Sequence, residues 1–239
     1  MRLGHLPLSA LDLTALILFL AVWLAYEPLL KAASRGKGHI NTDMTVIRGA
    51  WMRNMAVREN RFMDGQLLGH ALNSASFFAS SNLILIAAAA GALFGGEQTF
   101  RSASSLLVIK TSSRLLFEGQ IALVLVALAR GLLDFIWSIR QMNYCIAAVG
   151  AAPDSQDPAF EAAYGEAASR LINPALSSFN AGVRGYYFSL AAAAWLFGPW
   201  AFIAATLGAV ALLLSRQRKS KAAAAIADIR RLLEDRAKG

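Results

Sequence analysis

An arginine and an aspartate stand four residues apart inside an apolar stretch of the sequence. Arg130 and Asp134 belong to residues 116–139, and Ser138 and Gln141 continue their polar face. In a helix, a spacing of four places two side chains on one face, where opposite charges can pair. Ionisable groups at membrane depth cost about 2.5–3.5 kcal/mol on insertion scales and mark candidate pathways or proton relays. Two interpretations stay open: a water-filled or ion-conducting seam, or a neutralised pair that fixes helix register.

A second set of polar residues flanks the apolar stretches. Guanidinium and amide N–H groups donate hydrogen bonds to phosphate oxygens, so such a set can form a pocket for an anion or a lipid head group. The alternative is that the long basic side chains extend individually to lipid phosphates. The set comprises Asn73, Ser76, Arg140, Asn143 and Arg184.

The sequence contains no recognisable catalytic, metal-binding or cofactor-binding motif. His5, His39 and His70 lack the paired spacing of a zinc site. A glycine-rich phosphate loop, a GxSxG elbow and a Cys-x-x-Cys pair are all missing from the sequence. The single cysteine, Cys145, rules out an intrachain disulfide, and we expect it to pack as a small apolar residue. We therefore assign no catalytic residue, metal or cofactor. A protein that is not an enzyme is the preferred interpretation, and an intramembrane hydrolase that uses residues outside any known motif stays open as the alternative.

Four apolar stretches must position these polar residues. A helix needs about 20 apolar residues to cross the roughly 30 Å hydrocarbon core of a bilayer. The chain is 56% hydrophobic and only 16% charged, whereas a soluble domain carries about 25% charged residues. We therefore predict an all-α integral membrane bundle with about four transmembrane helices in a plasma or inner membrane. The predicted spans are residues 8–30, 72–95, 116–139 and 184–214.

The last predicted span contains Gly198-Pro199 near its middle. Proline removes one helical hydrogen bond and clashes with the preceding turn, so we expect a kinked helix. A hairpin at this point would have arms of only about 15 residues, too short for two crossings. We also expect Asn173-Pro174 to end a short helix that precedes the span.

Two amphipathic segments accompany the membrane bundle, which we assign to residues 1–215. In residues 43–70, Met44, Trp51 and Met55 recur at helical spacing. Such a basic amphipathic helix either lies in the membrane interface or packs against the protein's own bundle, and both interpretations stay open. The basic tail, residues 216–239, forms the second amphipathic segment.

The formal charge of +8 comes from Lys and Arg residues that flank the apolar stretches. Each such residue attracts anionic lipid head groups by about 1 kcal/mol, so we expect lipid and not nucleic acid as the partner. With four crossings, one side carries 12 basic residues and the other carries 10, which does not decide the orientation. We expect both termini to face the cytoplasm.

Several short motifs occur in an order that resembles a known family. They are Asp64-Gly65-Gln66 followed by residues 73–80, Trp137-Ser138-Ile139-Arg140 with Asn143, Gly182-Val183-Arg184 before Tyr186-Tyr187, and residues 195–199. Over about residues 5–215 the chain resembles the domain-of-unknown-function 599 family of multi-pass membrane proteins. The resemblance implies a helical membrane protein with about four spans, but no established activity, cofactor or catalytic residue.

Two functional hypotheses follow from these patterns. The first is a small channel or transporter subunit with a polar seam, which would need a homo-oligomer because four helices enclose little space. The second is a non-catalytic membrane scaffold or assembly factor that acts through helix packing. Small residues four apart let helix backbones approach closely in lipid, as at Ser76 and Ser80 or at Ala87 and Gly91.

Overall fold

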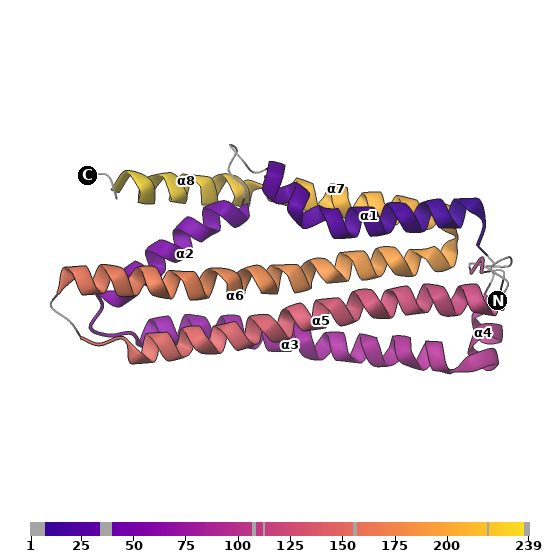
Figure 1. Cartoon of the computed structure of the whole chain (residues 1–239), viewed down its shortest axis with the longest axis horizontal. Coiled ribbons are helices and arrows are strands. Elements are labelled where there is room, and N and C mark those ends of the chain that lie inside the picture. Colours follow the sequence, from indigo (N-terminus) through magenta and orange to yellow (C-terminus); the bar gives the residue numbers. More distant parts are fainter. Residues whose placement is uncertain are drawn as a thin grey trace, which may run out of the picture. The chain divides into compact units, whose positions relative to one another are not determined.

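The computed structural model describes residues 8–33, 40–106, 109–111, 113–154, 157–218 and 220–236. Every regular element in these ranges is a helix, which confirms the all-α fold class (Figure 1). The elements are α1 (Ala10–Ala33), α2 (Ile40–Ala56), α3 (Phe62–Phe94), α4 (Gly96–Ser104), α5 (Arg114–Ala151), α6 (Pro158–Ala193), the 3-10 helix η1 (Ala194–Phe197), α7 (Pro199–Arg218) and α8 (Lys221–Arg236).

Four stretches among the described residues are long and apolar enough to cross a membrane. They are Ala10–Pro28, Phe62–Phe94, Arg114–Ala151 and Pro199–Arg236. At about 1.5 Å per residue, the 38 residues of α5 extend for roughly 57 Å. This length exceeds the roughly 30 Å hydrocarbon core, so α5 must continue beyond the bilayer. The same holds for the 33 residues of α3.

The helices form two compact units. The first unit comprises Met1–Ala32, Ser81–Leu132 and Val183–Leu213, and the second comprises Ala33–Ser80, Leu133–Gly182 and Leu214–Gly239. Helices α3, α5 and α6 each contribute one part to each unit. The hydrogen-bond cluster around Asp12 and Trp195 lies within the first unit, and the surroundings of Arg61 and of Arg48 lie within the second.

Aromatic rings form the core of the first unit. Phe19 of α1 is fully buried, with its ring centroid 6.1 Å from that of Phe188 on α6 and 5.1 Å from that of Phe202 on α7. Trp195 of η1 stacks on Phe202 at 5.0 Å. One ring of α1 therefore contacts the end of α6 and the start of α7 together.

The predicted span 184–214 is not a single helix. Helix α6 ends at Ala193, and α7 begins at Pro199 after a glycine with φ of 104°. This conformation favours glycine because other residues would place Cβ too close to the backbone. The chain reverses there, as Figure 1 shows between α6 and α7. The expectation of one kinked helix was wrong.

The error arose at Asn173-Pro174, which was expected to end a helix. Pro174 lies inside α6, which is 36 residues long in total. Proline at this position removes the hydrogen bond to the Arg170 carbonyl. Pro174 and Arg170 are both exposed on the protein surface. The arms of the hairpin are therefore 36 and 20 residues long, not about 15.

The predicted amphipathic helix 43–70 is two helices. Residues 57–61 separate α2 from α3, and the Asn60 side-chain oxygen accepts a hydrogen bond from the Phe62 amide at 2.9 Å. Such a bond satisfies one of the free N–H groups at the start of a helix, so it favours a new helix at this point.

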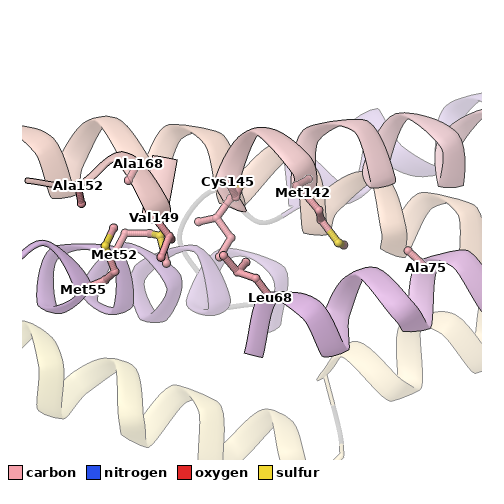
Figure 2. Packing of buried hydrophobic residues seen from close by; sticks show 11 residues of the cluster. Met52, Met55, Leu68, Ala75, Met142, Cys145, Val149, Ala152 and Ala168 are labelled. Carbon is pink, nitrogen blue, oxygen red and sulfur yellow. The ribbon is translucent and has the colours of Figure 1, made fainter. Parts of the chain in front are cut away.

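Helix α2 packs against its own unit, the second of the two interpretations left open by the sequence. Met52 and Met55 are at most 1% exposed and belong to a core with Leu68 of α3 and Met142 and Cys145 of α5 (Figure 2). Cys145 is a free thiol, 2% exposed, and fills this core as a small apolar residue. Helix α8 packs along the other side of α2.

Candidate functional site

The residues of the predicted polar seam have different environments along α5. Arg130 is exposed and Asp134 is half-buried, whereas Ser138 and Gln141 are buried. The Ser138 hydroxyl donates a hydrogen bond of 2.7 Å to the Ala175 carbonyl of α6. This bond ties two helices together inside the second unit, so Ser138 has a packing role.

The residues of the predicted anion pocket are mostly on the surface. Asn73 and Ser76 of α3 are exposed, as are Arg140 and Asn143 of α5. Arg140 donates from Nε to the Tyr144 hydroxyl, one turn along the same helix, at 2.6 Å. Its guanidinium therefore already has a partner within α5.

Arg184 belongs to the first unit, on α6. Its Nη2 lies 3.6 Å from Oε2 of Glu27 on α1, and its side chain is 12% exposed. A guanidinium that is paired with a carboxylate has less positive charge to offer a bound anion. Arg140 and Arg184 thus each have a partner within the protein, and the two arginines belong to different units.

A buried polar cluster joins the α6–α7 turn to α1 and α5. The Trp195 indole N–H donates to Asp12 Oδ1 at 2.8 Å, and Gln120 Nε2 donates to the Trp195 carbonyl at 3.1 Å. The Thr111 hydroxyl donates to Gln120 Oε1 at 2.8 Å. Ser9 donates to the other Asp12 oxygen from both its amide and its hydroxyl. Because both carboxylate oxygens accept hydrogen bonds from protein groups, the cluster fixes the turn in place.

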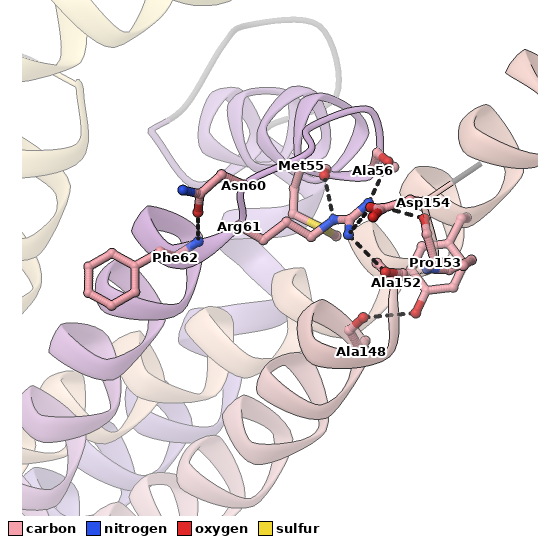
Figure 3. A network of polar contacts seen from close by, with 10 residues as sticks. Met55, Ala56, Asn60, Arg61, Phe62, Ala148, Ala152, Pro153 and Asp154 are labelled. Atoms are coloured by element: carbon pink, nitrogen blue, oxygen red, sulfur yellow. Dashed lines mark hydrogen bonds and ion pairs between the residues drawn. The ribbon is translucent and has the colours of Figure 1, made fainter. Parts of the chain in front are cut away.

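Arg61 occupies a second polar network, shown in Figure 3. Carbonyl groups in the last turn of a helix lack partners within the helix, and a guanidinium can satisfy several of them at once. The Arg61 side chain is only 15% exposed. It donates to the carbonyls of Met55 and Ala56 at the end of α2, to those of Ala152 and Pro153 after α5, and to the Asp154 carboxylate.

Three acidic side chains around α2 have cationic partners. Asp43 Oδ1 lies 2.7 Å from Arg230 Nη1 of α8, and Glu166 Oε2 of α6 lies 3.5 Å from Arg53 Nη1. Asp64 of α3 is fully buried, and its Oδ1 accepts hydrogen bonds from the Arg58 guanidinium and from the Trp51 indole. These three carboxylates are therefore already neutralised by other arginines or held by their hydrogen bonds.

Arg48 of α2 is the exception among the arginines of this helix. It is 9% exposed, and its Nε is buried without a hydrogen-bond partner among the described residues. Burial lowers the pKa of the Arg48 guanidinium, because the charged form loses hydration. Buried charges in proteins are ordinarily paired, so this guanidinium marks a candidate binding site.

The register of α2 against α6 places a second unsatisfied group opposite Arg48. Asn180 Nδ2 donates to Asn41 Oδ1 at 3.4 Å, and Arg53 pairs with Glu166, so the two helices run antiparallel. Seven residues are about two helical turns, and a step of seven from Asn41 and from Asn180 reaches Arg48 and Asn173. The Asn173 Oδ1 atom is also buried without a partner among the described residues.

The sequence alone did not single out Arg48 among the four arginines of residues 43–70. A signal was present, because Arg48 precedes Met52 by four residues and Met55 by seven. Both spacings bring residues to the same side of a helix. Arg48 therefore lies on the line of α2 that enters the core, whereas Arg53 is exposed.

Comparison with known proteins gives a family but no activity. The family model described as "Protein of unknown function, DUF599" matches residues 14–222, so the chain belongs to this family. Neither the curated proteins nor the solved structures gave a match.

Proposed function

We propose that this member of the family is a non-catalytic membrane scaffold whose helix α3 packs against a partner helix within the bilayer. The observation that carries the proposal is a line of small residues on α3 that the protein leaves uncovered. Ala87 and Gly91 of the first unit are exposed and lie four residues apart, and Ser76 and Ser80 of the second unit are exposed at the same spacing. A spacing of four keeps the two residues of each pair on one side of the helix.

Gly185 and Gly91, both in the first unit, differ in what lies next to them. A Cβ built on Gly185 of α6 would lie 3.1 Å from the Cα of Gly131 on α5, so this glycine lets two helices approach closely. A Cβ built on Gly91 would meet nothing within 4 Å. Transmembrane helices associate through such small-residue contacts because lipid provides no hydrophobic drive between them. The line on α3 suits a helix that is not part of this chain.

The hydrogen bonds of the buried polar residues support a packed bundle over a conducting one. Asn82 Nδ2 of α3 donates to the Leu128 carbonyl of α5 at 2.9 Å, and Ser138 donates to the Ala175 carbonyl. Both side chains join neighbouring helices at full burial, with at most 1% exposed. Hydrogen bonds of this kind stabilise contacts between helices, which supports a packing role for these two residues.

The hairpin between α6 and α7 is the basis for a fifth crossing, by α6, in addition to the four candidate spans. If α7 crosses the bilayer after a reversal at Gly198, α6 crosses in the opposite direction. The termini then lie on opposite sides, and the side that includes α2 and the tail carries 17 Lys and Arg residues (residues 31–71, 140–174 and 214–239). The other side carries 4, in residues 1–9, 95–114 and 194–198. The excess of basic residues favours a cytoplasmic C-terminus and an external N-terminus.

The scaffold is tested by measuring which complexes survive extraction. The Gly91→Leu variant adds bulk to the small-residue line of α3, and Gly208→Leu is its matched control. Gly208 is an exposed glycine of α7 whose built Cβ also meets nothing within 4 Å. All forms are extracted in polymer-bounded native membrane discs and weighed by native mass spectrometry.

Wild type and Gly208→Leu should carry a stoichiometric partner, either a second copy or another membrane protein, and Gly91→Leu should lose it. A wild-type protein that is always recovered as a lone monomer would contradict the scaffold. A selective ion or solute flux from liposomes containing the purified protein would also contradict it.

A further inference from the structure

Arg48 is a buried cation for which the described part of the chain provides no counter-charge. Only 9% of the Arg48 surface is exposed, and its Nε has no hydrogen-bond partner among the described residues. An isolated charge loses most of its hydration on burial and is rarely tolerated unless an opposite charge or several hydrogen bonds replace the water.

Among the described residues, the three acids around α2 already bind other partners. Asp43 is held by Arg230, Glu166 by Arg53, and Asp64 by Arg58 and Trp51. Each of these carboxylates lies within 4.0 Å of a different arginine. A counter-ion for Arg48 must therefore come from outside this set.

Asn173 adds a second ligand at the same level of the α2–α6 contact. Its side-chain oxygen is buried without a partner among the described residues, two helical turns from the Asn41–Asn180 pair. Rotation of an asparagine amide by about 180° exchanges its oxygen for an NH₂ group, at little cost when neither end is bonded. The site can then present donors from both the guanidinium and the amide.

We infer that Arg48 and Asn173 bind a phosphate group in the contact between α2 and α6. Guanidinium groups match phosphate oxygens with short, charge-assisted hydrogen bonds, and an asparagine amide completes the contact. Helix α2 begins seven residues after α1, a candidate membrane span, and Arg48 lies about 12 Å along it. The phosphate is therefore that of a lipid head group or a free phosphate from the aqueous phase. This inference is independent of the α3 scaffold surface.

The experiment measures thermal unfolding of the purified full-length protein in a maltoside detergent, which carries no phosphate. Inorganic phosphate is added against chloride at constant ionic strength, and a parallel series adds phosphatidylglycerol against diacylglycerol, which has no phosphate. The variants are Arg48→Gln and, as a charge-retaining second variant, Arg48→Lys. The control is Arg53→Gln, because Arg53 is an exposed arginine of the same helix.

Phosphate or phosphatidylglycerol should raise the unfolding midpoint of wild type and Arg53→Gln by about 3–6 °C at ten times the dissociation constant. Arg48→Gln should show no shift, and Arg48→Lys a reduced one. A response to inorganic phosphate would show that a free phosphate is enough to occupy the site. A response only to phosphatidylglycerol would identify a lipid head group as the ligand.

Two results would overturn the site. One is a wild-type midpoint that responds to neither additive. The other is an equal response in wild type and Arg48→Gln, because binding would then occur elsewhere. If Arg48→Gln does not fold, the wild-type titration and Arg48→Lys decide the question by the same criteria.

Discussion

The indole N–H of Trp195 donates a hydrogen bond of 2.8 Å to the carboxylate of Asp12, although 183 positions separate the two residues in the chain. Both are buried, with 3% and 7% of their surfaces exposed. The bond connects the start of α1 to the turn that reverses the chain between α6 and α7. It is one of the contacts that hold this hairpin in the first unit.

Breaking this bond should destabilise the first unit. We expect Trp195→Phe to cost about 1–3 kcal/mol, because a buried carboxylate oxygen then loses a donor. Combining it with Asp12→Asn should give a non-additive double-mutant cycle with a coupling of about 0.5–3 kcal/mol. Equilibrium unfolding in mixed micelles measures both. Strictly additive effects would show that the bond contributes nothing.

Gly198 should resist substitution because its φ is 104°. An L-residue in a left-handed conformation is strained, so we expect Gly198→Ala to lower the free energy of unfolding by about 1–2 kcal/mol. The control, Gly208→Ala, is an exposed helical position where alanine should stabilise by about 0.5–1 kcal/mol. The unfolding midpoints of the two variants should therefore shift in opposite directions. Shifts of the same sign would contradict a left-handed conformation at Gly198.

Substitution of Arg61 should destabilise the second unit more than substitution of Arg53. We expect Arg61→Ala to cost about 2–4 kcal/mol, because several carbonyls at the ends of α2 and α5 lose their donor. Arg61→Lys should not rescue it, since an ammonium cannot reproduce the planar fork. Arg53→Ala, which removes an exposed ion pair, should cost less than about 1 kcal/mol. Equal losses at both positions would contradict this account.

The two ends of the chain should report opposite sides of the membrane. Alkaline phosphatase, active only outside the cytoplasm, should be active when fused to the N-terminus and inactive when fused to the C-terminus. Green fluorescent protein should give the complementary pattern. Activity of phosphatase at the C-terminus, or the same result at both ends, would rule out the five-crossing orientation.

Much of the membrane architecture could be predicted from the sequence, because apolar length is a strong signal. The break at Gly198-Pro199 was visible too, but its consequence depended on the length of the preceding arm. Proline was expected to stop α6 at residue 174, whereas an exposed position allows the helix to continue. Because of this one error, residues 184–214 were predicted to be one kinked span and not the second half of a hairpin.

The candidate site was harder to predict, since burial of a charge depends on the neighbouring helices. Arg140 and Arg184 were predicted pocket residues because they flank apolar stretches, and each has a partner within the protein in the structure. Arg48 is one of four arginines in residues 43–70, and its residue type does not distinguish it from the others. Only the packing of α2 against α5 and α6 separates it from Arg53.

Cysteine cross-linking at Gly91 tests the scaffold most directly. In a Cys145→Ala background, Gly91→Cys and Gly208→Cys are each oxidised in native membranes and the products are separated by mass. The account predicts a discrete adduct from residue 91, to a second copy or to a thiol of another membrane protein, and none from residue 208. No adduct from residue 91, or equal adducts from both positions, would contradict it.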